Sequence, residues 1–245
     1  MERKVIMYLR YQIGKFINSL GFTLISSRRI PKFYINHVEF VYRLLRLSYP
    51  SKVLTIIQVG AFDGLVSDPL HKVLEIDSNI RAILVEPQDK PFSCLVEKYK
   101  SFNHIYLENS AVTEKDGLLT LYVPNPDASP QASSNPNHFR RFGFSPKAVK
   151  QISVQSISVD SLLSKFNVSD IDLLQIDTEG ADLEVFKFFL ATGNNPKILN
   201  LESYHLDAKD KDELHSILNS NGYSYFDIGF DTVAVQNNLI HGTSL

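Results

Sequence analysis

Three carboxylates, Asp177, Glu179 and Asp182, directly follow an apolar run at residues 171–176. Gathering carboxylates at the end of a buried strand is costly unless they meet cations, protons or the donors of a ligand. A helix N-cap and a favourable first helical turn account for Asp182 and in part for Glu179, but hardly for Asp177. The passage therefore predicts a functional site rather than a structural turn.

A further acid and an imidazole, Glu202 and His205, follow the next apolar run at residues 197–201. Histidine is the side chain whose ordinary pKa lies closest to neutral pH, which suits it to accept and return protons. A single histidine is more often structural, so both roles of His205 stay open at this point. If the two apolar runs are neighbouring strands, His205 lies close to the three carboxylates.

Two glycines, Gly60 and Gly64, frame a turn that follows an apolar run at residues 53–59. A dinucleotide-binding turn needs glycine at the position that Phe62 occupies, and the carboxylate of Asp63 would repel a pyrophosphate. Nicotinamide and flavin cofactors are therefore disfavoured, whereas a ligand with an ammonium or sulfonium group would be attracted. A strand-to-helix turn that binds nothing is the structural alternative.

Two later strand ends carry groups that suit a nucleoside. Glu86 follows an apolar run at residues 82–85, where a carboxylate accepts hydrogen bonds from both hydroxyls of an adenosine ribose. An ordinary surface glutamate is the alternative. Ser110 and Ala111 follow a run at residues 104–107 and could bracket an adenine, although this signal is weak by itself. The glycine turn and Glu86 together predict a cofactor that contains a nucleoside.

The elements that position these residues alternate between strands and helices. Strands are predicted at residues 53–59, 82–85, 104–107, 118–123, 152–159, 171–176, 197–201, 223–228 and 232–235. Helices are predicted at residues 87–100, 161–166, 182–190 and 207–221. This alternation is typical of an α/β fold with a doubly wound, mainly parallel sheet and helices on both faces. Ligands bind such sheets beyond the carboxyl ends of the strands, where the residues named above lie.

The first part of the chain follows a different pattern. Apolar residues at steps of three and four predict amphipathic helices at residues 5–20 and 33–47, and a Tyr-Pro-Ser sequence ends the second one. We therefore expect an N-terminal helical extension at residues 1–50 and a larger domain at residues 51–245. The extension holds nine Lys and Arg against two Asp and Glu. Its helices would pack on the acidic remainder, on a second protomer or on an anionic membrane surface.

Composition excludes several classes of protein. The 245 residues are 44% hydrophobic and 21% charged, and the single cysteine, Cys94, allows no internal disulfide. The longest apolar stretch without a formal charge has ten residues, too few to span a bilayer. The start of the sequence lacks the apolar region of a signal peptide, so we expect a cytoplasmic protein. Residues 51–245 carry sixteen Lys and Arg against twenty-five Asp and Glu, which argues against a nucleic-acid partner.

In this order the motifs resemble those of the FkbM-type methyltransferases, which are S-adenosylmethionine-dependent enzymes with the seven-stranded class I fold. The resemblance covers about residues 57–235. The motifs that carry it are QVGAFDG at residues 58–64, VEP at residues 85–87, NSAV at residues 109–112, LQIDTEG at residues 174–180 and the acid Glu202. The family often has Asn where Phe62 stands, and many class I enzymes have an acid where Gln58 stands.

The resemblance implies S-adenosylmethionine as the cofactor and O-methylation of a hydroxyl on a sugar, a glycan or a small metabolite. A binding or scaffold module that keeps the fold without catalysis is the alternative. The residues expected to bind the cofactor are Gly60, Ala61, Asp63, Gly64, Glu86, Ser110, Ala111, Asp177 and Glu179.

For the removal of the hydroxyl proton the sequence offers His205, Asp177 and Glu202. We favour His205 as the base, with Glu202 orienting it or the substrate. Asp177 is the close alternative, because it lies nearest to the expected position of the sulfonium. A divalent cation held by Asp177 and Glu202 stays open, but no metal is predicted.

A long polar stretch at residues 124–148 interrupts the alternation and is rich in Pro, Asn and Ser. It holds His138, Arg140 and Arg141 near its centre. Long irregular segments inside compact domains are commonly lids or binding loops. We therefore expect this segment to cover or border the acceptor site. Because arginine suits bidentate contacts with phosphate or carboxylate groups, the acceptor could be acidic or phosphorylated.

Overall fold

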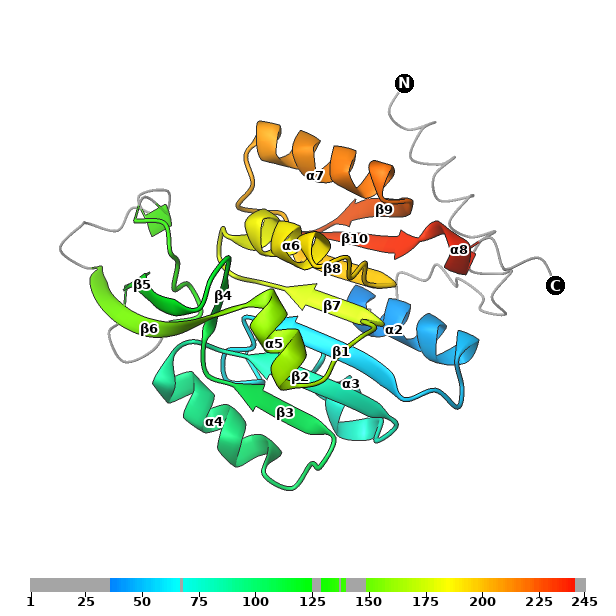
Figure 1. Cartoon of the computed structure of the whole chain (residues 1–245), viewed down its shortest axis with the longest axis horizontal. Coiled ribbons are helices and arrows are strands. Elements are labelled where there is room, and N and C mark those ends of the chain that lie inside the picture. The colour runs from blue at the N-terminus through cyan, green and yellow to red at the C-terminus, as the bar shows by residue number, and fades with distance from the viewer. Residues whose placement is uncertain (1–35, 67, 125–128, 137, 140–148, 241–245) are drawn as a thin grey trace, which may run out of the picture. The chain divides into compact units, whose positions relative to one another are not determined.

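The centre of the fold is a seven-stranded sheet (Figure 1). The computed structural model describes residues 36–66, 68–124, 129–136, 138–139 and 149–240. In spatial order the strands are β3 (Ile105–Glu108), β2 (Ile80–Val85), β1 (Leu54–Val59), β7 (Leu173–Ile176), β8 (Ile198–Glu202), β10 (Asp231–Gln236) and β9 (Tyr223–Ile228). The first five strands run parallel to one another, and β10 runs antiparallel to both of its neighbours, β8 and β9. This arrangement confirms the predicted doubly wound, mainly parallel sheet.

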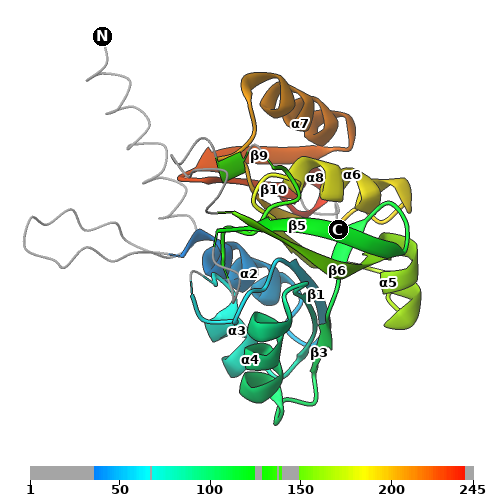
Figure 2. The ribbon, with the colours of Figure 1, turned by 90° about the vertical axis from the view of Figure 1, so that its left-hand side faces the viewer.

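Helices cover both faces of this sheet (Figures 1 and 2). The helices α5 (Val159–Lys165), α6 (Asp182–Ala191) and α7 (Ala208–Ser220) pack against one face, and α2 (His37–Ser48), α3 (His71–Ile76) and α4 (Asp89–Tyr99) pack against the other. A short helix, α8 (Asn237–Ile240), follows β10. Successive side chains of a strand point to opposite faces of the sheet. Ile57 therefore lies in the core on the side of α5, α6 and α7, and its neighbour Ile56 lies in the core on the side of α2, α3 and α4.

A second, three-stranded sheet stands apart from the central one. It consists of β4 (Ala111–Thr113), β6 (Lys150–Ser158) and β5 (Gly117–Val123), in that order. The predicted strands at residues 118–123 and 152–159 therefore pair with each other, with Val123 opposite Lys150, and not with the central sheet. The strand β4 and the helix α3 are absent from the sequence-based prediction because each is too short to show a periodic pattern.

The helix α2 belongs to the domain and not to an N-terminal extension that ends at residue 50. Its apolar stripe, Val38, Val41, Tyr42 and Leu45, is at most 5% exposed and packs in the same core as β1 and α3. The compact unit accordingly begins at Asn36. Asn36 caps the helix by accepting from the amides of the residues that follow it. The first predicted helix, at residues 5–20, lies outside the described residues.

Removing α2 is therefore expected to unfold the domain. A chain that begins at Tyr49 loses four buried side chains, each of which contributes about 1.5–3 kcal/mol, whereas typical domains are stable by only about 5–15 kcal/mol. A chain that begins at Asn36 keeps them and serves as the control. Circular dichroism and urea unfolding check this expectation. A cooperative transition of unchanged midpoint in the shorter chain would contradict it.

No helix among the described residues is both long enough and apolar enough to cross a membrane.

Candidate active site

The carboxyl ends of β1 and β7 meet in a close backbone contact. The amide of Asp177 donates to the carbonyl of Val59 at 3.0 Å, and the amide of Gly60 donates to the carbonyl of Val85 at 3.0 Å. Gly60 has a φ of +84°, and a Cβ there would overlap the Asp177 carbonyl. Glycine is thus required at this position, because the chain that leaves β1 lies in direct contact with the backbone that leaves β7.

Glu86 ties this turn to the end of β2. Its carboxylate accepts from the amide of Phe62 at 2.9 Å and from that of Gln88 at 2.8 Å. Glu86 is 3% exposed, and burial raises its pKa to about 7 although both amides stabilise the ionised form. Phe62 has a φ of +47°, a conformation that asparagine adopts more readily than phenylalanine. A titratable carboxyl therefore lies where the ribose-binding acid was expected.

The other predicted residues of the glycine turn are held by local contacts. The carboxylate of Asp63 accepts from the amides of Leu65 and Val66, so it closes the turn. Ala61 is buried, and its carbonyl accepts from the amide of Gly64 at 3.0 Å. The structure places these residues at the expected edge of the sheet, and their contact with a cofactor stays a prediction.

The end of β3 is linked to Glu86 by Asn109. The side-chain amide of Asn109 donates to the backbone carbonyl of Glu86 at 3.0 Å. Ser110 is buried and donates to the carboxylate of Glu108 at 2.6 Å, while Ala111 packs in the small sheet's core. Both residues predicted to bracket an adenine thus have structural contacts, and their role in binding is a prediction still.

Asp177, Asp182 and Glu202, here called the acidic group, have carboxylate oxygens within 4.8 Å of one another. Burial raises the pKa of each, and the charges of neighbouring acids, including Asp231, raise those of Asp177 and Glu202 further. Among the described residues, no lysine or arginine forms an ion pair with the group. This concentration of acid is suited to a cationic ligand.

Asp182 has a different local role from the one expected. It is the first residue of α6, and the N-cap residue is Ala181, which makes no side-chain cap. The Asp182 carboxylate instead accepts from the amides of Thr178 and Gly180 at 2.7 and 2.9 Å. The N-cap interpretation is therefore wrong, because Asp182 closes the turn that precedes the helix.

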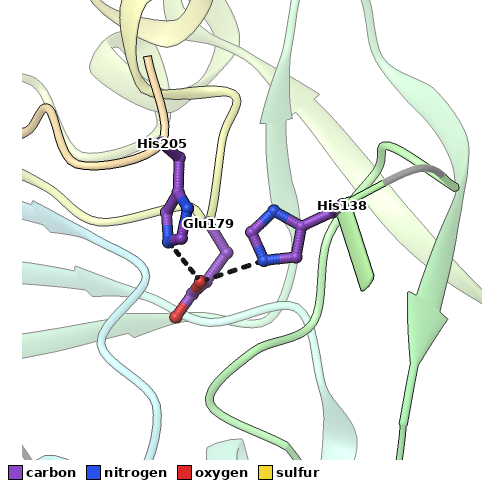
Figure 3. A group of neighbouring side chains, drawn as sticks. All are labelled: His138, Glu179 and His205. Atoms are coloured by element: carbon purple, nitrogen blue, oxygen red, sulfur yellow. Dashed lines mark ion pairs between the residues drawn. The ribbon is translucent and has the colours of Figure 1, made fainter. Parts of the chain in front are cut away.

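His138, Glu179 and His205, here called the His–Glu–His group, lie beside the acidic group. The Glu179 Oε2 atom is 3.0 Å from His205 Nε2 and 3.3 Å from His138 Nε2, and both imidazoles point at this oxygen in Figure 3. Burial alone would raise the pKa of Glu179, but the two histidines outweigh it and lower that pKa. Glu179 is consequently an anion between two imidazoles.

The structure brings the predicted His205, Glu202 and Asp177 to one place but changes the partner of His205. Glu202 Oε2 lies 3.6 Å from His205 Nε2, whereas Glu179 lies at 3.0 Å. Glu179, which was expected to bind the cofactor, is therefore the carboxylate that orients this imidazole. His138 was absent from the predicted base and cofactor residues, and its only sequence signal was its place in the long polar stretch.

Another buried acid, Asp68, lies near the site. Its Oδ1 atom accepts from the Gln58 amide at 3.1 Å and from the Leu70 backbone at 2.8 Å. Its Oδ2 atom is buried and accepts no hydrogen bond from a described residue. Burial raises the pKa of Asp68, while these two donors oppose the rise. Asp68 was not predicted, because it stands in a turn rather than at a strand end.

The strand order and the acid-lined carboxyl edge define a class I methyltransferase type of α/β protein. The sequence model of the methyltransferase FkbM domain matches residues 58–225. The chain belongs to this family.

Several solved structures to which this chain is similar are described as methyltransferases. Precorrin-6y C5,15-methyltransferase from Geobacter metallireducens GS-15 has 12% identity and a TM-score of 0.41, covering 86% of this chain and 91% of that chain. A methyltransferase from Geobacter sulfurreducens has 10% identity and a TM-score of 0.42, covering 96% and 97%. The CurJ carbon methyltransferase has 11% identity and a TM-score of 0.47, covering 82% and 52%. A comparison with curated proteins gives no match.

The family implies S-adenosylmethionine as the cofactor, and the residues present fit it. Glu86 offers a buried carboxyl at the end of β2, where a ribose would be bound. The acidic group and the Asp68 Oδ2 atom, which accepts no hydrogen bond from a described residue, offer carboxylate oxygens at this edge. A ligand with an ammonium and a sulfonium would supply the positive charge that these carboxyls need.

Proposed function

We propose that this protein transfers the methyl group of S-adenosylmethionine to a hydroxyl oxygen of a sugar, a glycan or a small metabolite. The observation that carries the choice of oxygen is the imidazole of His205 held by the carboxylate of Glu179 at the acid-lined edge. A hydroxyl must lose its proton as the methyl is transferred, and a positioned base contributes about 10²–10⁴-fold to such a step. The bound cofactor supplies an electrophilic methyl group.

Within this proposal Glu86 holds the cofactor's ribose and the acidic group faces its positive charge. Glu86 keeps acceptor capacity, since each of its two oxygens accepts from one backbone amide and a carboxylate has about four acceptor positions. Asp177 and Glu202 are then counter-charges for the cofactor. The divalent cation considered for these two residues is replaced here by the cationic cofactor.

We assign proton removal to His205. Because Glu179 accepts from Nε2, the neutral imidazole carries its proton there and has its lone pair on Nδ1. A proton taken up at Nδ1 makes an imidazolium, whose charge the Glu179 anion stabilises. Asp177 remains the alternative base, but it lies among carboxyls and is better matched to a cation.

The acceptor would lie on the His138 side of the site. The segment that carries His138 also places Ser133 so that its hydroxyl donates to the Glu179 carbonyl at 2.7 Å. Next to His205, the half-exposed ring of Tyr204 packs edge-on against exposed Phe230, with centroids 4.7 Å apart. Such rings suit contact with the apolar face of a sugar or small metabolite. Arg140 and Arg141, expected to contact an acidic acceptor, lie outside the described residues.

A screen with labelled S-adenosylmethionine against hydroxylated metabolites and glycans tests this function. The expected product carries the label on an oxygen, which nuclear magnetic resonance identifies. Products labelled on nitrogen or carbon would refute O-methylation. Calorimetry that finds no cofactor binding by the folded protein would instead favour the scaffold alternative.

The affinity for S-adenosylmethionine is expected to fall as the pH is lowered through 7. The pKa of Glu86 in the free protein is about 7, and only the carboxylate accepts hydrogen bonds from both ribose hydroxyls. A proton therefore competes with the cofactor, so Kd should rise about tenfold between pH 8 and pH 6. Calorimetry across this range measures the effect.

The control for this prediction is Glu86→Gln, which cannot ionise. We expect it to bind more weakly at pH 8 and to lose the component of the pH dependence centred near 7. If Glu86→Gln kept both the parent's affinity and its full pH profile, Glu86 would not be part of the cofactor site.

A further inference from the structure

We propose that His138, Glu179 and His205 also form a binding site for one divalent transition-metal ion, such as zinc or cobalt. The two imidazole Nε2 atoms lie 3.0 and 3.3 Å from the same Glu179 oxygen. A tetrahedral zinc ion with bonds of about 2.0–2.1 Å separates its ligand atoms by about 3.4 Å, and a higher coordination number brings the ligand atoms closer together. Two of the three separations are therefore those of ligands around an ion, and all three ligand atoms lie within 4.8 Å of one another.

The chemistry of the donors selects the kind of ion. Two imidazoles and one carboxylate suit zinc and the other later divalent transition metals, whereas magnesium and calcium prefer oxygen ligands alone. Glu179 supplies the carboxylate, and its Oε2 atom faces an Nε2 atom of each imidazole. Two imidazoles and one carboxylate are thus gathered on the described residues.

The three ligands come from three separate segments that the fold holds together. His205 follows β8, Glu179 lies in the turn between β7 and α6, and His138 belongs to the stretch between β5 and β6 (Figure 3). The His138 and His205 side chains are only 3% and 6% exposed. The Ser133 hydroxyl holds the backbone of Glu179 by donating a hydrogen bond to the Glu179 carbonyl. Burial and this support reduce the ordering that an ion would otherwise impose.

One consequence rests on the proposed function. An ion at His205 Nε2 displaces the proton from that nitrogen, so the neutral ring carries its proton on Nδ1 and has no lone pair to offer an acceptor hydroxyl. The ion-loaded protein should therefore transfer methyl groups slowly, and a chelator should restore the rate. Metal binding itself does not depend on methyl transfer.

The test is a titration of the full chain, first stripped by a chelator, with cobalt(II) and then with zinc. We expect one cobalt ion per chain, visible as d–d absorption bands, and its displacement by zinc. The variants His138→Ala, Glu179→Gln and His205→Ala should each lose at least tenfold in affinity. His215→Ala is the matched control, because His215 contacts Asp227 at 3.4 Å outside the group, and it should bind as the parent does.

Circular dichroism and cofactor binding establish that each variant is folded. The absence of stoichiometric cobalt binding by the folded parent would overturn the proposal, as would unchanged affinity in all three folded variants. If zinc binds at this group and leaves the transfer rate unchanged, the metal site stands and the assignment of His205 as base fails. If no metal binds but His205→Ala is inactive, the base stands and the metal site fails.

Discussion

Replacing His205 by alanine should slow methyl transfer by about 10²–10⁴-fold, the usual contribution of a positioned base. The affinity for S-adenosylmethionine should change little, because His205 contacts Glu179 and not the expected ribose site. Single-turnover rates with saturating cofactor measure the loss, and calorimetry measures the affinity. The surface variant His215→Ala should keep the parent's rate.

The comparison with Asp177→Asn decides between the two candidate bases. If Asp177 is a counter-charge for the cofactor, this variant should bind the cofactor more weakly. If His205→Ala instead keeps nearly full turnover and its pH profile, while Asp177→Asn binds the cofactor but does not transfer, the base is Asp177. The rate against pH for both variants provides the decision.

Gly60→Ala should destabilise the domain by about 4 kcal/mol or more, which places it among the exceptional single substitutions. The added Cβ would overlap the Asp177 carbonyl, and alanine at a φ of +84° is strained as well. Either the end of β1 or the end of β7 has to move. Urea unfolding measures the loss of free energy.

Gly193→Ala separates the overlap from the strain. Gly193 has a φ of +79°, but a Cβ there meets nothing within 4 Å. Its cost should be about 1–3 kcal/mol, the cost of the backbone conformation alone. Equal losses in the two variants would show that the contact between Gly60 and Asp177 has no special weight.

The central sheet could be predicted because its middle strands, β2, β1, β7 and β8, are buried on both faces. Such strands are short runs of apolar, often β-branched residues, so the predicted run at residues 197–201 differs from β8 by one residue at each end. The place of α2 was not predictable in this way. Its stripe from Val38 to Leu45 shows that a partner is needed, but an apolar stripe does not specify which surface it covers.

The candidate site was predicted where it depends on the strand ends and not where it depends on turns. Asp177 directly follows β7 and Glu202 ends the neighbouring β8, so sheet topology brings them together. Glu179 is turned toward His205 by a backbone with a φ of +56°, which no periodic pattern reveals. His138 reaches the same carboxylate from a distant segment, and the second sheet that positions this segment was not foreseen.

Because Val123 and Lys150 are directly opposite each other in the antiparallel pair of β5 and β6, the stretch between them begins and ends at one point of the small sheet. A change in its length leaves the pairing of β5 with β6 in place, provided that Ser133 and His138 still reach Glu179. If this stretch borders the acceptor as proposed, it can be exchanged between family members as one unit. A chimera that receives this stretch from another family member should keep cofactor binding and acquire the donor's choice of acceptor.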